Sequence, residues 1–218
     1  MIMTGLCKRD KMMERDFMTS AEFYHNILAI ETEALAQELA AASQEEFFKT
    51  GDLLLQAGDI SNYIYFLEHG VIRGYLLNAN GNDVTDCFVY RCGEACMASF
   101  DRLELDIPSL CTLEVLEDSK CFRVPMETVI ALQQKYPEVT LLYNRQLISS
   151  LEKHWGAKLA LCQLSATERY QWFLETYPDL IHRIRDKHIA SFLNITPVTL
   201  SRLRRTLRDK QCAASAEE

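Results

Sequence analysis

Residues 185–210 read RDKHIASFLNITPVTLSRLRRTLRDK, and this stretch predicts two short helices joined by a tight turn. Asn194 lies at the turn, where a short polar residue tolerates the left-handed backbone that a sharp reversal requires. Thr196 is placed to cap the second helix, and Pro197 stands at its first position, where a missing N–H group does no harm. Ala190 is small enough to let the helices cross closely. The spacing indicates a helix-turn-helix.

The second helix, 197–207, is expected to enter the major groove of DNA, because its leucines face inward and its polar and basic residues face outward. An ordinary helical hairpin is the alternative, but it would not need so many outward-facing Arg, Ser and Thr side chains. Val198 and Ser201 are expected near base edges, and Arg202 is the best candidate for a bidentate contact with guanine. The expected DNA contacts, ending with the three expected at phosphates, are Thr196, Val198, Thr199, Ser201, Arg202, Arg204, Arg205 and Arg208.

The charge distribution agrees with a small nucleic-acid-binding module at the end of an acidic chain. The net charge is −8, which by itself argues against nucleic acid. Residues 182–210, however, hold eight Lys and Arg against two Asp, whereas the rest of the chain holds 15 basic residues against 29 acidic ones. A basic end on an acidic body is the pattern expected when one module touches phosphates, although a solvated surface helix would give the same charges.

The middle of the chain predicts an antiparallel β-roll or barrel. A helical segment is expected first, over 21–43. From about Phe47 short apolar runs alternate with turn residues, and the NANGN turn at 78–82 is the strongest hairpin signal. The strands are expected at 53–56, 63–67, 71–77, 84–90, 111–116 and 120–124.

A long helix is expected over 138–164, after a shorter one that Pro137 stops. Apolar residues recur there at every seventh position, which is typical of a helix that pairs with its copy in a homodimer. The alternative is packing against its own roll, and apolar positions off this seam would allow both at once. The seam residues are Leu141, Ile148, Trp155 and Cys162.

The chain is therefore expected to be α+β with four parts: a loose N-terminus (1–20), a sensor domain (21–137), a dimerisation helix (138–164) and a helical DNA-binding domain (165–218). Ser165 with a Glu three residues on is a capping-box pattern for the first helix of that last part. No apolar run approaches the roughly 18 residues of a membrane span, and no signal peptide is evident, so a cytoplasmic protein is expected.

The eight cysteines have no C-x2-C spacing and are interpreted as small buried hydrophobic residues of a reducing compartment. The alternative is a redox- or metal-sensing regulator that uses Cys87, Cys92 and Cys96 with the same DNA-binding module. An enzyme is not expected, because no nucleophile–base motif, P-loop or H-E-x-x-H is present.

The order of roll, long helix and helix-turn-helix resembles the Crp/Fnr family of bacterial transcription factors over about residues 25–210. GDLLLQAGD (51–59), YIYFLEHGVIRGYL (63–76) and NGNDVTDCF (80–88) are similar to its cyclic-nucleotide-binding-like domain, and IASFLNITPVTLSRLRRTL (189–207) to its helix-turn-helix. The resemblance implies a double-stranded β-helix (cupin-like) sensor in a homodimer. An effector would reposition two recognition helices on a palindromic operator in double-stranded DNA. RNA polymerase would be a partner if the protein is an activator.

The resemblance also implies an effector pocket near Gly93, Glu94, Met97, Ser99 and Ser109. Cyclic-nucleotide binders of the family follow the Gly-Glu pair with an Arg that grips the cyclic phosphate, and here Ser109 stands where that Arg is expected. The effector is therefore unidentified and is not expected to be cyclic AMP, although Arg91 and Arg102 are nearby in sequence. No cofactor is expected. After residue 207 the chain is too short and polar for the family's β-hairpin wing, so a wingless domain is expected.

Overall fold

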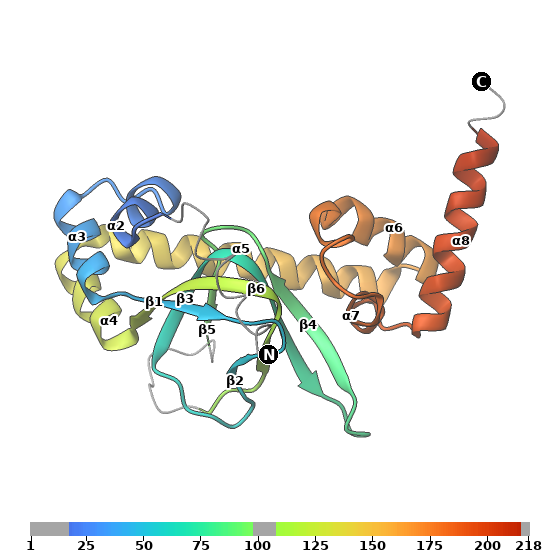
Figure 1. Cartoon of the computed structure of the whole chain (residues 1–218), viewed down its shortest axis with the longest axis horizontal. Coiled ribbons are helices and arrows are strands. Elements are labelled where there is room, and N and C mark those ends of the chain that lie inside the picture. The colour runs from blue at the N-terminus through green and yellow to red at the C-terminus, as the bar shows by residue number, and fades with distance from the viewer. Residues whose placement is uncertain (1–17, 98–107, 215–218) are drawn as a thin grey trace, which may run out of the picture.

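A computed structural model describes residues 18–97 and 108–214 of the chain (Figure 1). A β-roll lies against the long helix α5, small helices cover one end of the roll, and the C-terminal helices lie at the other end. The strands are β1 (Gln44–Phe48), β2 (Leu53–Leu55), β3 (Tyr63–Leu77), β4 (Asp83–Val89), β5 (Ala95–Met97) and β6 (Thr112–Pro125). The helices are α2 (Ser20–Glu22), the π-helical turn η1 (Phe23–Ile27), α3 (Glu33–Ala42), α4 (Met126–Lys135), α5 (Pro137–Gln163), α6 (Ala166–Thr176), the 3-10 turn η2 (Pro178–Leu180), α7 (Asp186–Phe192) and α8 (Pro197–Ala214).

Two long strands, β3 and β6, carry the antiparallel sheet, whose order is β1-β6-β3-β4, with β2 on β6 and β5 on β3. The sequence predicted each of them as two strands, and that prediction is wrong. Gly70 does not end a strand: it has a φ of 115° inside β3, and a Cβ there would lie 2.0 Å from Ser119 Oγ on β6. The glycine lets the strands cross closely while the pairing register shifts around it.

The single helix predicted over 21–43 is also wrong, because the chain turns between η1 and α3. Ala29 adopts a left-handed backbone with a φ of 53°. Phe23 and Tyr24 before the turn and Ile30 after it are all buried in one core with Phe122 of β6. A residue with a left-handed backbone cannot continue a right-handed helix, so the chain changes direction at Ala29.

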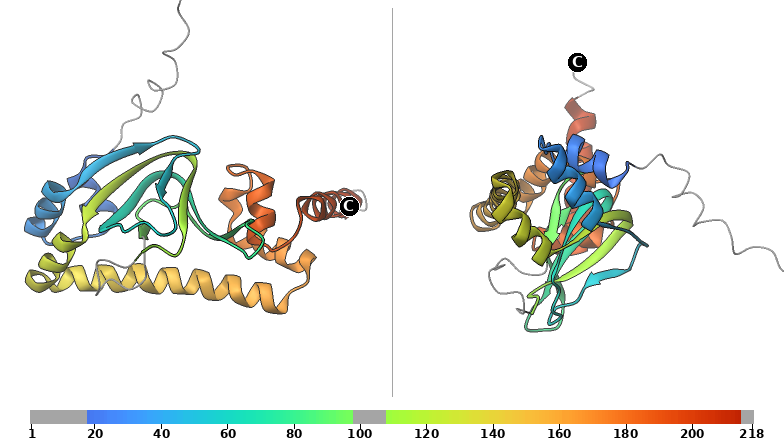
Figure 2. Two further views of the ribbon diagram at one scale, coloured as in Figure 1. Left: turned by 90° about the horizontal axis from the view of Figure 1, so that it is seen from below. Right: turned by 90° about the vertical axis from the view of Figure 1, so that its left-hand side faces the viewer.

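The helix α5 matches the long helix expected at 138–164 and packs on the roll with one face. Val139 and Leu142 are buried against the roll core. None of the described residues covers the opposite face, as Figure 2 shows along the length of the helix. Its exposed apolar side chains include Leu141, Ile148, Leu151 and Trp155.

The roll and the C-terminal helices share one hydrophobic core. Phe88 of β4 packs on Phe192 of α7, with ring centroids 5.2 Å apart, and on Phe173 of α6 at 6.4 Å. Ser191 of α7 accepts a hydrogen bond from Thr85 N (2.9 Å) and donates one to a backbone carbonyl of β4. The helix-turn-helix is thus docked on the sensor side of the chain in this structure.

The C-terminal part is helical throughout the described residues, and no strand follows α8 there. The helix α8 extends away from the rest of the molecule (Figure 2). The capping box predicted at Ser165 is confirmed, since its side chain accepts from Glu168 N and the Glu168 side chain accepts from Ser165 N. In the described part of the chain, none of the helices combines the length and apolar character that crossing a membrane needs.

Candidate functional site

The turn between α7 and α8 has the geometry that its sequence predicts. Asn194 adopts the left-handed conformation, with a φ of 51°. Ile195 N donates to Ala190 O at 3.0 Å, which closes the turn on the small residue of the first helix. Thr196 Oγ1 accepts from Thr199 N at 3.1 Å and so caps α8. Pro197 is the first residue of α8, as expected.

The helix α8 presents two different faces. Leu200 is fully buried in the shared core, and Leu203 and Leu207 pack partly against it. On the other face Val198 is 60% exposed, and Ser201, Arg202, Arg205 and Arg208 are exposed as well. This face is polar and basic, and no other part of the described structure covers it, which is what a helix needs to enter a DNA groove.

Arg204 differs from its expected role as a phosphate contact. Its guanidinium lies 2.7 Å from Asp186 of α7 and donates a hydrogen bond to the Tyr170 hydroxyl of α6 at 3.0 Å. These contacts hold α8 against the other two helices. The structure therefore places Arg204 among the residues that fix the helix-turn-helix. The exposed arginines of α8 are Arg202, Arg205 and Arg208, of which Arg205 lies 4.0 Å from Asp209 on the same helix.

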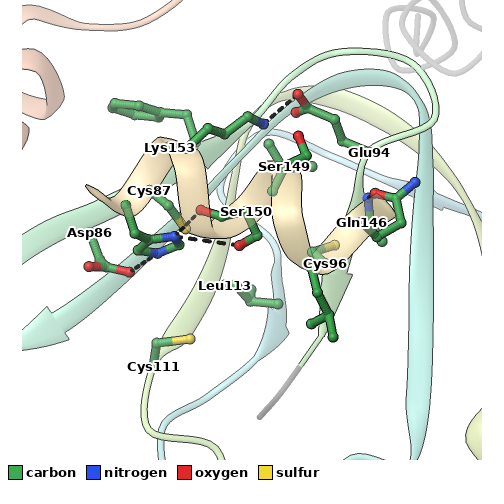
Figure 3. A pocket seen from close by; sticks show the side chains of 15 residues that line it. Asp86, Cys87, Glu94, Cys96, Cys111, Leu113, Gln146, Ser149, Ser150 and Lys153 are labelled. Atoms are coloured by element: carbon green, nitrogen blue, oxygen red, sulfur yellow. Dashed lines mark hydrogen bonds and ion pairs between the residues drawn. The ribbon is translucent and has the colours of Figure 1, made fainter. Parts of the chain in front are cut away.

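A cavity of about 80 Å³ lies between the roll and α5 (Figure 3). We call it the effector cavity, after the pocket that the sequence resemblance implies. Most of its surface is apolar, and its polar side chains come from β4, the loop before β5 and α5. Its lining residues are Asp86, Cys87, Phe88 and Val89 of β4, Glu94, Ala95, Cys96, Cys111 and Leu113 of the neighbouring strands and loops, and Gln146, Leu147, Ser149, Ser150, Lys153 and His154 of α5.

Glu94 is held rigidly at one end of the effector cavity. Its carboxylate accepts hydrogen bonds from Tyr90 N (3.0 Å) and Arg91 N (3.2 Å) and forms an ion pair with Lys153 of α5 (Figure 3). Gln146 adds a second link, because its side chain donates to Gly93 O at 2.8 Å and accepts from Ala95 N at 3.2 Å. The loop before β5 and the helix α5 are therefore fastened together by charge and by amide hydrogen bonds.

A cluster of three different titratable side chains lies at the other end of the cavity. His154 Nε2 is 3.0 Å from Asp86 Oδ2, and one ligand atom from each of Asp86, Cys87 and His154 lies within 4.8 Å of the others. The hydrogen bond to Asp86, with a smaller contribution from Cys87, raises the pKa of His154 to about 10. His154 is therefore cationic at neutral pH in the absence of another ligand.

The residues expected in the effector pocket are only partly brought together. Glu94 lines the cavity, and the carbonyl of Gly93 lies beside it on Gln146. Ser109 does not line it, which corrects the prediction: it is buried where its backbone pairs with the β2–β3 loop, and Ser109 N donates to Asp59 O at 2.8 Å. Met97 is the last residue of β5, and its side chain lies outside the described part of the structure. Ser99 and Arg102 lie outside the described residues.

The three cysteines of the redox alternative do not converge on one site. Cys87 and Cys96 line the cavity, but Cys92 is exposed and lines another surface. Burial raises the pKa of Cys96 well above its ordinary value, so this thiol is neutral and of low reactivity. Sequence reasoning missed Asp86 and His154 as neighbours of Cys87, because 68 positions separate the acid from the histidine.

Comparison with known proteins shows which known fold this chain has. Residues 45–136 match the family model of the cyclic nucleotide-binding domain. No curated protein matches the chain. Among solved structures, the chain is similar to a transcriptional regulator of the Crp/Fnr family from Eubacterium rectale, with a TM-score of 0.67 at 16% identity over 86% of this chain and 88% of that one. The chain has the Crp/Fnr fold.

Two further structures share the Crp/Fnr fold with this chain. The c-di-GMP-responsive global regulator CLP from Xanthomonas campestris has a TM-score of 0.70 at 13% identity, over 83% of this chain and 93% of that one. FixK2 from Bradyrhizobium japonicum has a TM-score of 0.68 at 18% identity, over 78% and 86%. The likeness covers both the roll and the helices that follow it, as the sequence resemblance predicted.

Proposed function

We propose that this protein is a sequence-specific, DNA-binding transcription regulator of the Crp/Fnr type and not an enzyme. The observation that carries the proposal is the outer face of α8, where Val198, Ser201 and Arg202 are exposed at the start of a capped helix. Arg202 is the residue for a guanine, and Val198 suits a thymine methyl group. Arg205 and Arg208 are further along the helix and suit phosphates. Such a protein would work on chromosomal DNA in the cytoplasm, with RNA polymerase as a partner if it activates.

The experiment compares two arginines of α8 on operators selected from random duplexes by the wild-type protein. Arg202→Ala should weaken binding to the selected operator by roughly 1–3 kcal/mol and relax the sequence preference at one base pair. Arg205→Ala should weaken binding to all duplexes alike. The slope of log affinity against log salt concentration should fall by about 1, which corresponds to the loss of one phosphate contact. Lys49→Ala is the control, because it removes a charge in the β1–β2 turn, where Lys49 pairs with Asp118. Unchanged selectivity in Arg202→Ala would contradict the proposed orientation of α8.

The proposed assembly is a two-fold homodimer through α5 on a palindromic operator. The support is the apolar stripe on the face of α5 that the roll leaves uncovered, where Ile148 is 56% and Leu151 66% exposed. Exposed apolar side chains at this spacing on one helix are typical of a seam between two helices. Two recognition helices related by this two-fold axis would read half-sites about one helical turn apart.

The proposed effector binds in the cavity between the roll and α5 and is not cyclic AMP. A cyclic phosphate needs a cation, and the described cations that line the cavity, Lys153 and His154, are each paired with a carboxylate. The cavity volume of about 80 Å³ is also well below the roughly 300–1,000 Å³ of sites that enclose nucleotide-sized ligands. Calorimetry with millimolar cyclic AMP should give no saturable heat, and micromolar binding would refute this reasoning.

A further inference from the structure

The cluster of Asp86, Cys87 and His154 lies where three parts of the molecule meet. The first two residues are on β4 and the third is on α5. Asp86 and His154 line the effector cavity on one side, and on the other they line a groove that reaches Ser191 and Phe192 of α7. In the described part of the chain this is the single group of three such side chains close enough to share an ion.

A β-bulge brings two neighbouring residues of one strand to the same place. Adjacent side chains of a regular strand point to opposite faces, so Asp86 and Cys87 would ordinarily diverge. Here Gly74 pairs with Cys87 and Tyr75 pairs with Thr85, which leaves Asp86 as the extra, unpaired residue of a bulge. Bulges of this kind re-aim side chains and are enriched next to functional sites. Both side chains are consequently within reach of His154.

The strand opposite the cluster leaves room for the thiol. A Cβ on Gly74 of β3 would lie 2.8 Å from Cys87 Sγ, closer than a carbon and a sulfur atom can approach. Glycine at this position therefore makes space for the Cys87 side chain at the bulge. The position of the sulfur depends on two features of the sheet, the extra residue in β4 and the missing side chain in β3.

The imidazole of His154 is oriented as metal-binding histidines are. Its Nδ1 lies 2.8 Å from the backbone carbonyl of Ser150, which leaves Nε2 to face Asp86. Metal-bound histidines characteristically donate the N–H of one ring nitrogen to a carbonyl or carboxylate and bind the ion through the other. The supporting hydrogen bond of such a ligand is thus already formed by the backbone of α5.

The geometry points to a binding site for a divalent metal ion of the zinc class, held by Cys87 Sγ, His154 Nε2 and a carboxylate oxygen of Asp86. Thiolate and imidazole ligands select zinc-like ions over magnesium and calcium. Ligand bonds of about 2.0–2.3 Å put tetrahedral ligand atoms about 3.5 Å apart. The three atoms lie within 4.8 Å of one another, so no pair needs to close by more than about 1.3 Å, and His154 Nε2 and Asp86 Oδ2, now 3.0 Å apart, need only to separate slightly. The ion replaces the proton between His154 and Asp86, and the cysteine binds as a thiolate.

Three protein ligands leave a fourth coordination position, and the effector cavity lies beside it. Water or a small effector would occupy that position, which suits a cavity of about 80 Å³. The ion would also tie β4 to α5 at the edge of the groove toward α7. The metal site stands independently of DNA binding, whereas its role as the effector site rests on the proposed function.

The test is a cobalt titration of the full-length protein, because Co²⁺ fills zinc-class sites and reports its ligands by absorption. We expect one Co²⁺ per chain, with a thiolate-to-cobalt charge-transfer band that Zn²⁺ abolishes by displacement. Cys87→Ser should remove the band, and His154→Gln should weaken Co²⁺ binding at least about 100-fold. Cys92→Ser is the matched control, since Cys92 is an exposed thiol outside the cluster, and it should keep both the band and the affinity.

Gly74→Ala gives a second, independent test that removes no ligand. The added Cβ displaces the sulfur, so Co²⁺ binding should weaken at least about tenfold while circular dichroism shows a folded protein. Absence of Co²⁺ binding, a band that survives in Cys87→Ser, or a Gly74→Ala affinity equal to wild type would each overturn the metal site.

Operator binding is measured separately, with and without Zn²⁺. A metal-dependent change of at least about fivefold that Asp86→Asn abolishes supports the effector role, and no change overturns that role alone. If no variant or wild-type protein binds any duplex while Co²⁺ still binds, the proposed function fails and the metal site stands.

Discussion

The buried His188 leads us to expect that acid lowers the stability of the protein where the helix-turn-helix packs against the roll. It lies on α7, is only 4% exposed, and burial lowers its pKa to about 4, with the nearby Arg73 and Lys187 acting in the same direction. Glu114 and Asp83 face the same histidine and oppose that shift, but the net direction is downward. The neutral imidazole is therefore the form that the docked helix accepts.

Proton linkage gives the sign and the size of this change in the free energy of unfolding. An unfolded His has a pKa of about 6.5, so between pH 6.5 and 4 the unfolded chain binds more protons at this residue than the folded chain does. Stability from this group is complete above pH 6.5 and falls as the pH falls toward 4. With these pKa values the loss is about 2 kcal/mol at pH 5 and about 3 kcal/mol at pH 4.

The assay is urea unfolding followed by tryptophan fluorescence, because Trp172 stacks on Phe192 in the core that α7 shares with the roll. The free energy of unfolding is compared between wild type and His188→Gln at pH 7.5 and pH 5, so that the other titrating groups cancel. Wild type should lose about 2 kcal/mol more than the variant. His182→Gln, at an exposed position of the same domain, is the control and should follow wild type. Equal losses in wild type and His188→Gln, or a larger loss in the variant, would refute the buried neutral histidine.

Two further predictions concern assembly and the roll. Ile148→Asp should dissociate the dimer into folded monomers at micromolar concentration in light scattering, because the exposed α5 stripe would then bury an unpaired charge; a variant that stays dimeric would contradict the α5 interface. Gly70→Ala should lower the unfolding free energy by more than about 2 kcal/mol, because it adds a clash with Ser119 to the strain of a positive φ. Gly51→Ala is its control, since Gly51 has the same backbone region but open space around it, and equal losses in the two variants would show that the close strand crossing is not limiting.

The helix-turn-helix could be predicted from the sequence because its determinants are local. Asn194, Thr196 and Pro197 each act on backbone groups within a few residues, through a left-handed turn, a cap and a first helical position. The strands could be predicted only in outline. Gly70 has the composition of a turn, but its role depends on Ser119 on a strand 49 positions away, which no local pattern reveals.

The effector cavity was the least predictable part, because its polar residues meet across long separations. The seven-residue repeat on α5 indicated an interface on one face of the helix. It gave no sign of the polar residues on the face that points toward the roll. Lys153 reaches Glu94 over 59 positions, and His154 reaches Asp86 over 68. Ser109 was placed in the pocket by resemblance alone, and its backbone hydrogen bond to Asp59 in the β2–β3 loop holds it away from the cavity.

The strand β4 connects the cavity to the helix-turn-helix within four consecutive residues. Thr85 donates its N–H to Ser191 of α7, Asp86 and Cys87 line the cavity, and Phe88 packs against Phe192. A ligand in the cavity can change DNA binding only if it binds the docked and undocked arrangements of α7 with different affinities. The bulge at Asp86 places the cavity side chains and the α7 contacts on one short stretch of backbone. If an ion draws Asp86 and Cys87 toward His154, we expect the same backbone movement to shift Thr85 and Phe88, which contact α7.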